Sequence, residues 1–288
     1  MSVPEQAIDR EREFNFTFDD FERIRRLIYS YAGINLNPTK HNMVYSRLAR
    51  RLRATGKSSF SEYLSWLERE DTSGEWQAFV NALTTNLTSF FREPHHFDTL
   101  SQYLRQHRDK NRIRLWCAAC STGEEAYSIA MIAAEAYNSF TPPVEIIASD
   151  LDTNVLAIAQ QGVYSNDRLE KMSKYRISKF FLKGKNKNEG KVRICTELRN
   201  LVKFQQFNLL DKEWSLSGPF DAIFCRNILI YFDKVTQLKV LHKITRLLTP
   251  DGLLFVGHSE SLLHASHMLR LRGKTVYELT PLMKVSYV

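Results

Sequence analysis

Four short apolar runs in the sequence end in polar or small residues that could contact a ligand. The first, at residues 113–117, leads into a turn of small residues at 118–123, and the second is followed by Asp150. The later two are followed by Asn208 and Leu209 and by Arg226 and Asn227. In an open parallel sheet, ligands bind outside the carboxyl ends of the strands. The pattern therefore predicts one binding site assembled from four strand ends.

The residue types at these strand ends favour a cofactor that carries ribose but no phosphate. An acid such as Asp150 can accept hydrogen bonds from ribose hydroxyls. A dinucleotide site would need Gly-x-Gly-x-x-Gly in the first turn, whereas this turn has only Gly123 and is followed by Glu124 and Glu125. Two acids oppose the binding of a pyrophosphate at a helix start. The predicted ligand is the cationic cofactor S-adenosylmethionine, with S-adenosylhomocysteine as product.

We expect no metal at this site. Cys117 and Cys120 form a Cys-x-x-Cys pair, but no second pair or nearby histidine completes a zinc set. Small residues at a strand end are the preferred interpretation of the two cysteines.

The sequence on either side of Pro94 shows two different hydrophobic patterns. From Phe18 to about Arg92, apolar residues recur at helical spacing, with a capping box at Thr17 and Asp20 and a helix stop at Gly56. After Pro94, short apolar runs alternate with helical stretches, as in βα units. The expected strands are 113–117, 144–149, 201–204, 222–225 and 253–256, with helices at 124–137, 154–161 and 233–248 and an edge hairpin at 269–272 and 275–279.

These patterns predict an α/β protein with an open, Rossmann-like sheet. We expect an N-terminal all-α domain with its linker at residues 1–92 and an α/β domain at 93–288. Residues 162–203 break the βα alternation, are rich in lysine and contain two short β runs around a polar turn. We interpret them as a small inserted β-subdomain.

The charge is concentrated in two segments. The 40 Lys and Arg against 32 Asp and Glu give a net charge of +8. Residues 38–57 carry +6 and residues 162–203 carry +8, so the remainder is mildly acidic. This distribution favours two localised contacts with acidic partners. No apolar run approaches the roughly 18 residues that a membrane helix needs. The first residues lack the apolar h-region of a secretory signal peptide. The four scattered cysteines suit a reducing cytoplasm.

Several motifs together resemble the chemotaxis receptor methyltransferase family, from about residue 18 to residue 279. They are Asn-Leu-Thr-Ser-Phe-Phe-Arg at 86–92, Ser-Thr-Gly-Glu-Glu at 121–125, Ala-Ser-Asp at 148–150, Phe-Asp-Ala-Ile-Phe-Cys-Arg-Asn at 220–227, Ile-Tyr-Phe-Asp at 230–233 and the segment 250–260. The resemblance implies a protein-glutamate O-methyltransferase that forms γ-glutamyl methyl esters on chemoreceptors. It also implies that the open sheet is of the S-adenosylmethionine-dependent methyltransferase type and that residues 93–288 are the methyltransferase domain.

The resemblance also implies roles for individual residues. The residues similar to cofactor contacts are Asn86, Thr88, Arg92, Glu125, Asp150, Asn208, Leu209, Arg226 and Asn227. Arg92 and Tyr231 resemble the catalytic residues placed nearest the transferred methyl group. A glutamate carboxylate is already ionised at neutral pH, so the reaction needs in-line orientation rather than a general base. His258 is interpreted as a structural histidine.

The implied partner is the cytoplasmic helical region of methyl-accepting chemotaxis receptors, so the expected location is the cytoplasm, with recruitment to membrane receptor clusters. The basic segment 38–57 would face the acidic methylation region, and we expect neither nucleic-acid binding nor membrane insertion. In part of the family the β-subdomain also captures a receptor C-terminal tether peptide as an added strand. Here Lys183 and Lys191 stand where arginines would suit carboxylate recognition.

Two other functions compete with this interpretation. The sequence pI of about 9.3 favours a nucleic-acid methyltransferase, although the position after residues 222–225 lacks the Pro-Pro-aromatic motif of amino-directed DNA enzymes. A non-catalytic scaffold that binds S-adenosylmethionine or receptor is the second alternative. The presence of Arg92 and Tyr231 argues against a scaffold.

Overall fold

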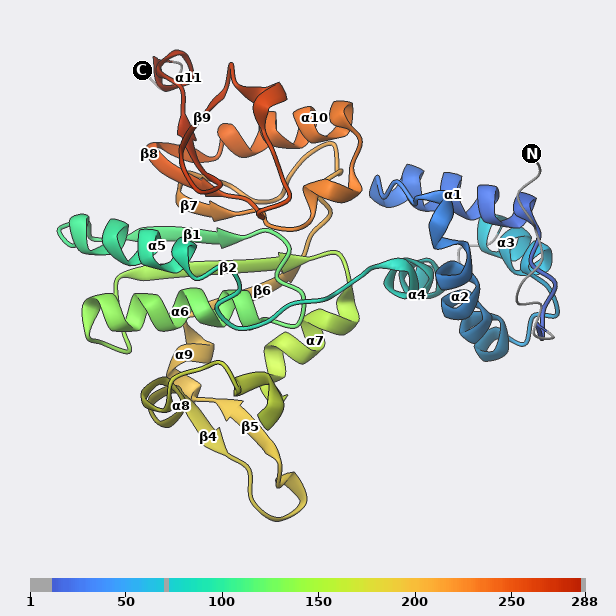
Figure 1. Ribbon diagram of the computed structural model, residues 1–288, viewed down its shortest axis with the longest axis horizontal. Coiled ribbons are helices and arrows are strands. Elements are labelled where there is room, and N and C mark those ends of the chain that lie inside the picture. Colours follow the sequence, from blue (N-terminus) through green and yellow to red (C-terminus); the bar gives the residue numbers. More distant parts are fainter. Residues whose placement is uncertain (1–11, 70–72, 286–288) are drawn as a thin grey trace, which may run out of the picture. The chain divides into compact units, whose positions relative to one another are not determined.

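The computed structural model describes residues 12–69 and 73–285, and the chain divides into two compact units between Thr84 and Thr85 (Figure 1). The first unit is helical and the second is an α/β unit.

Among its described residues the first unit contains four α-helices, in agreement with the apolar residues that recur at helical spacing from Phe18 onward. Thr17 caps the first helix, accepting from the Asp20 N–H while the Asp20 side chain accepts from the Thr17 N–H, so the capping box is confirmed. Gly56 ends the second helix at φ +66°, a conformation that favours glycine. The elements are α1 (Phe18–Ala32), the 3₁₀ helix η1 (Pro38–Lys40), α2 (His41–Thr55), α3 (Phe60–Arg69) and α4 (Ser73–Leu83).

The second unit is built on a seven-stranded sheet in the order β6-β2-β1-β7-β8-β10-β9. The first five strands in this order are parallel, and β10 and β9 add the antiparallel edge hairpin that the sequence predicts. Strand order reverses between β1 and β7, which places the ligand site at their carboxyl ends. The strands are β1 (Ile113–Cys117), β2 (Val144–Asp150), β6 (Val202–Gln206), β7 (Phe220–Phe224), β8 (Leu248–Phe255), β9 (Leu269–Gly273) and β10 (Val276–Leu279).

Alternating side chains of the strands supply two cores, one on each face of the sheet. Leu115 of β1 belongs to the core beneath α5 (His95–Gln106), α6 (Glu124–Tyr137) and α7 (Thr153–Gln161). Its neighbour Trp116 belongs to the opposite core beneath α10 (Lys234–Thr245). The sequence expectation did not include α5, although Phe97, Leu100 and Leu104 are buried at helical spacing.

A small three-stranded antiparallel sheet lies within the region expected to be inserted. Its order is β3-β5-β4, formed by β3 (Val163–Ser165), β4 (Phe181–Lys183) and β5 (Lys191–Ile194). The two short β runs predicted there are confirmed as β4 and β5, and Figure 1 shows this sheet standing apart from the main sheet. The short elements around it are η2 (Asn166–Leu169), α8 (Lys174–Phe180), η3 (Asn186–Asn188) and α9 (Thr196–Asn200). The remaining elements of the unit are η4 (Leu229–Tyr231), η5 (Leu263–Ala265) and α11 (Pro281–Val285).

Candidate functional site

The turn after β1 is tied to the end of β2 by Asp150. One carboxylate oxygen of Asp150 accepts from the Ser121 N–H at 2.8 Å, and the other accepts from the Asp152 N–H at 3.0 Å. Ser121 has φ +48°, a strained conformation for a residue with a side chain. Burial raises the pKa of Asp150 to about 6, although the two N–H donors act in the opposite direction. Asp150 therefore lies at a strand end, as predicted, and its pKa is raised.

Asn86 joins this corner from the segment that precedes α5. Its side-chain amide donates to the Asp152 carboxylate at 2.8 Å, and its carbonyl accepts from the Ser121 hydroxyl at 3.1 Å. Asp152 also caps α7 by accepting from the Asn154 N–H at 2.9 Å. The predicted residues Asn86 and Asp150 are therefore brought to one corner of the sheet through Ser121 and Asp152.

Arg226, at the end of β7, is the centre of a second group of contacts. Its side chain is 1% exposed and its guanidinium lies 2.5 Å from a carboxylate oxygen of Glu125, at the start of α6. The guanidinium also donates to the Arg92 carbonyl at 2.6 Å and lies 3.4 Å from the Glu93 carboxylate. The structure thus brings together three predicted residues, Arg92, Glu125 and Arg226, with Glu93 as an unpredicted partner.

Burial acts to raise the pKa of Glu93, but the positive charge of Arg226 and hydrogen bonds from His258 outweigh it and lower this pKa. His258 donates its backbone N–H to Glu93 at 3.3 Å, and its ring Nδ1 lies 3.2 Å from the same oxygen. The exposed His258 is thus a partner of a buried carboxylate. Glu93 is ionised at neutral pH as a result.

Asn227 is held in place by a buried glutamate of the loop after β8. Asn227 has φ +58°, and Glu260 accepts from its backbone N–H at 2.8 Å and from the Gly257 N–H at 2.6 Å. A Cβ atom on Gly257 would lie 2.2 Å from the Asn227 side-chain nitrogen, so only glycine permits this approach. Burial raises the pKa of Glu260. The loop after β8 therefore positions the residue that follows β7.

Other predicted residues make contacts outside these two groups. The Thr88 carbonyl accepts from Arg168 at 3.0 Å, and the Asn208 side chain accepts from the Leu210 N–H at 3.0 Å. Tyr231 is the last residue of η4, half-buried, and its N–H donates to the Ile228 carbonyl at 3.1 Å. The contacts described for these three residues do not join them to Arg226 or Asp150.

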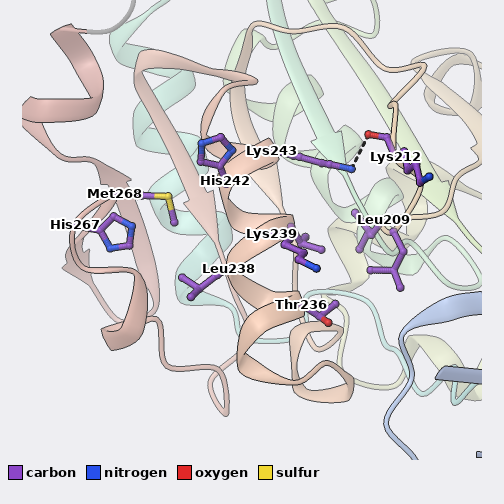
Figure 2. A pocket seen from close by; sticks show the side chains of 11 residues that line it. Leu209, Lys212, Thr236, Leu238, Lys239, His242, Lys243, His267 and Met268 are labelled. Atoms are coloured by element: carbon purple, nitrogen blue, oxygen red, sulfur yellow. Dashed lines mark hydrogen bonds between the residues drawn. The ribbon is translucent and has the colours of Figure 1, made fainter. Parts of the chain in front are cut away.

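Leu209 lines a groove of about 710 Å³ alongside α10. Figure 2 shows Leu209 on the same side of α10 as Lys239 and Lys243, with Met268 on the other side, and Lys243 donates to the Lys212 carbonyl at 3.0 Å. Among the predicted cofactor residues, all of which the structure describes, Leu209 alone lines this groove. The groove is therefore distinct from the contacts around Arg226.

Glu93, Asp152 and Glu260 are the site residues that the sequence interpretation missed. Glu93 and Glu260 accept from backbone N–H groups of loops, whereas Asp152 accepts from the first turn of α7. Asp152 and Glu260 each have a partner within three residues of their own position. The sequence did contain an indication for Asp152, because an aspartate directly before a helix is a common N-cap. Glu93 carries no comparable local pattern, because its partner His258 lies far away in sequence. Glu260 has a distant partner in Asn227 in addition to the nearby Gly257.

Glu93 and two histidines form a cluster of metal-binding residue types. The candidate ligand atoms of Glu93, His95 and His96 lie within 4.8 Å of one another. Arg226 lies 3.4 Å from Glu93, and the cluster stands at the start of α5, where the helix dipole is positive. Both features oppose a bound cation. Burial also raises the pKa of the free thiols of Cys117 and Cys120, which leaves them as thiols rather than thiolate ligands.

The basic segment of the first unit is less positive in the fold than in the sequence. Arg51 forms an ion pair with Glu75 at 2.5 Å, and Arg53 and Lys57 pair with other acids. Arg47 donates to the carbonyls that end α4. Lys40 and Arg50 are exposed and form no ion pair with any residue between 12 and 69 or between 73 and 285. The positive surface thus depends mainly on these two side chains.

The charges around Arg226 suit S-adenosylmethionine. Two carboxylates, Glu93 and Glu125, face one guanidinium, so the buried group is negative by one charge. S-adenosylmethionine is positive by one charge, because its ammonium and sulfonium exceed its carboxylate. Arg226 also retains a buried Nε–H without a partner among the described residues. Arg226 and Glu125 would hold the methionyl end of this cofactor, and Asp150 would accept from its ribose hydroxyls.

The sheet order, the reversal between β1 and β7 and this set of strand-end residues define an S-adenosylmethionine-dependent methyltransferase. The family model described as the CheR methyltransferase SAM binding domain matches residues 86–277, and that of the CheR methyltransferase all-alpha domain matches residues 19–84. The chain belongs to the CheR methyltransferase family.

Two relatives illustrate how far the similarity extends. The chain is 53% identical to chemotaxis protein methyltransferase 2 of Pseudomonas aeruginosa, over 92% of this chain and 95% of that protein. It is 49% identical to the chemotaxis protein methyltransferase of Escherichia coli, over 90% of each chain. The similarity therefore includes both units. In the part of the chain that the structure describes, no helix has the length and apolar character needed to cross a membrane.

Proposed function

We propose that this chain transfers the methyl group of S-adenosylmethionine to glutamate side chains in the cytoplasmic helical region of chemotaxis receptors, forming γ-glutamyl methyl esters. The observation that carries the proposal is the identity of about half of all residues with chemotaxis protein methyltransferases over nine-tenths of both chains. The negative group around Arg226 and the acidic strand end at Asp150 support the cofactor part of the proposal.

The proposed chemistry requires orientation and charge rather than proton removal. The cofactor supplies an electrophilic methyl group, and a glutamate carboxylate is ionised at neutral pH, so no general base is needed. The half-buried Arg92 donates one N–H to the Leu87 carbonyl at 3.1 Å, and a guanidinium has five donors, so it can also orient a carboxylate. Tyr231 would direct the attacking oxygen with its hydroxyl.

A labelling experiment tests the proposal. The full chain is incubated with methyl-labelled S-adenosylmethionine and a receptor cytoplasmic fragment, and the label is divided into base-labile and base-stable fractions. A base-labile label that releases methanol supports glutamyl esters. Base-stable label, or label confined to added DNA or RNA, contradicts the proposal. Bound cofactor without any label would instead indicate a scaffold. A receptor fragment with its candidate glutamates replaced by alanine is the matched control.

The small sheet suggests a second contact with the receptor. β4 is an edge strand of the order β3-β5-β4, Leu182 is 56% exposed, and Lys183 and Lys191 are exposed beside it. We propose that β4 adds a receptor C-terminal tether peptide as a further strand and that this recruits the chain to receptor clusters in the cytoplasm. Gly184 donates its N–H to the Lys191 carbonyl of β5, so Leu182, two residues earlier, also faces β5, and Lys183 presents its N–H to the open edge. Lys183→Pro would remove this outward-facing backbone donor. A fluorescent tail peptide that binds wild-type chain and the variant equally would contradict tether capture at β4.

A further inference from the structure

The backbone on either side of Arg92 adopts a conformation that residues other than glycine rarely take. φ is +53° at Phe91 and +58° at Glu93. Such a conformation is strained for a residue with a side chain and persists only where surrounding contacts hold it. Because these two residues enclose Arg92, the contacts that maintain the strain also determine where Arg92 lies.

Contacts from three other elements hold this segment. The Phe91 N–H donates to the buried Ser128 hydroxyl of α6 at 3.0 Å. The Arg92 carbonyl accepts from Arg226, which follows β7, at 2.6 Å. Glu93 accepts from the backbone N–H of His258, which follows β8, at 3.3 Å. Glu93 thus connects the Arg92 segment to the ends of two strands.

Glu93 also fixes the orientation of Arg226. The guanidinium lies between the carboxylates of Glu125 at 2.5 Å and Glu93 at 3.4 Å. One carboxylate oxygen of Glu93 and the Nε–H of Arg226 are buried without a hydrogen-bond partner among the described residues. Buried polar groups that lack partners reduce stability. Stability alone therefore does not explain why a second carboxylate is placed here.

We infer that Glu93 is a positioning residue, an inference that rests on the proposed cofactor chemistry. Its carboxylate holds Arg226 and the strained Arg92 segment in place to bind the methionyl end of S-adenosylmethionine. Its charge also contributes to selection between cofactor and product. S-adenosylmethionine carries a sulfonium that is lost in S-adenosylhomocysteine, so a nearby carboxylate stabilises the cofactor more than the product. A merely structural role for Glu93 would affect both ligands equally.

The test compares Glu93→Gln with a matched control, Glu145→Gln, by calorimetric binding of S-adenosylmethionine and S-adenosylhomocysteine to the full chain. Glu145, near the start of β2, pairs with Arg112 at 2.5 Å at the opposite end of this strand from Asp150. We expect Glu93→Gln to weaken cofactor binding about tenfold and product binding about threefold, as one charge-assisted interaction is lost. Glu145→Gln should leave both affinities unchanged. Equal weakening of both ligands, or unchanged affinities, in Glu93→Gln would overturn the inference.

A second variant keeps the inference testable if Glu93→Gln does not fold. The His258 side chain is 67% exposed, so His258→Ala removes one partner of Glu93 from the surface without opening the core. We expect about threefold weaker cofactor binding with an unchanged melting temperature, and wild-type affinity would overturn the inference. These binding measurements need no receptor. Failure of receptor methylation by a chain that binds cofactor would therefore refute the proposed function and still leave the role of Glu93 decided.

Discussion

Replacing Asp150 with asparagine should remove most of the pH dependence of cofactor binding. Asp150 ends β2 and accepts from the N–H groups of Ser121 and Asp152 at 2.8 and 3.0 Å. Burial raises its pKa to about 6 from an ordinary 3.8. An ionised carboxylate accepts hydrogen bonds from ribose hydroxyls more strongly than a neutral group does. Cofactor affinity should therefore follow the ionised fraction of Asp150.

The size of this effect follows from the pKa of about 6. About nine-tenths of the Asp150 carboxyl is ionised at about pH 7 and about one-tenth at about pH 5, so affinity should fall about tenfold between them. The stability of the ligand-free chain should depend on pH in the opposite direction. Because the pKa in the folded chain lies above the ordinary value, the stability contributed by Asp150 is present below about pH 4 and is lost as the pH rises through 6.

The assay is calorimetric titration of S-adenosylhomocysteine into wild-type chain and Asp150→Asn across this pH range. Asparagine does not ionise, so the variant should bind more weakly than wild type at neutral pH, show little pH dependence and approach wild type in acid. If both chains lose affinity in parallel, the titrating group lies elsewhere, for example at Glu260, whose pKa burial also raises. A flat wild-type profile would show that ionisation of Asp150 does not control cofactor affinity.

Three further substitutions separate catalysis, stability and receptor encounter. Tyr231→Phe should slow methyl transfer roughly tenfold to a hundredfold by removing one hydrogen bond to a charged group, with unchanged calorimetric affinity for S-adenosylhomocysteine; normal turnover would remove its proposed role. Asp221→Asn should lower the free energy of unfolding, measured in urea, by about 2–4 kcal/mol, because this buried carboxylate accepts from Lys110 at 2.6 Å. Cofactor binding should not weaken, because Asp221 lies at the opposite end of β7 from Asn227. Arg50→Glu should raise the KM for receptor, most at low salt, because Arg50 is exposed and unpaired among the described residues; an equal change in Arg246→Glu, an exposed arginine of the second unit, would argue against a specific surface.

The sequence was sufficient to predict the strand ends because both signals there are local. A buried strand such as Ile113–Cys117 is a short apolar run, and the ligand residues follow it directly. The order of the strands then brings Glu125 and Arg226 together, although 101 positions separate them. The geometry of a parallel sheet therefore made it possible to predict a shared site from residues that lie far apart in the sequence.

Features that depend on distant partners could not be predicted in the same way. Glu93 meets His258 across 165 positions, and no periodicity connects them. For a similar reason the sequence could not show that part of the positive charge of the basic segment is paired, since Arg51 forms its ion pair with Glu75 on another helix. α5 was missed because Pro94, which precedes it, provides no side-chain cap, although the apolar residues of its buried face recur at helical spacing.

The most direct test of the central claim is to locate the transferred methyl group within the receptor. Receptor fragment is incubated with the full chain and S-adenosylmethionine, digested with protease, and its peptides are sequenced by tandem mass spectrometry before and after treatment with base. The proposed function predicts a mass increase of one methyl group in place of a proton on glutamate side chains, reversed by base and absent without cofactor. Methyl groups found on lysine, arginine or main-chain nitrogen, and resistant to base, would contradict it.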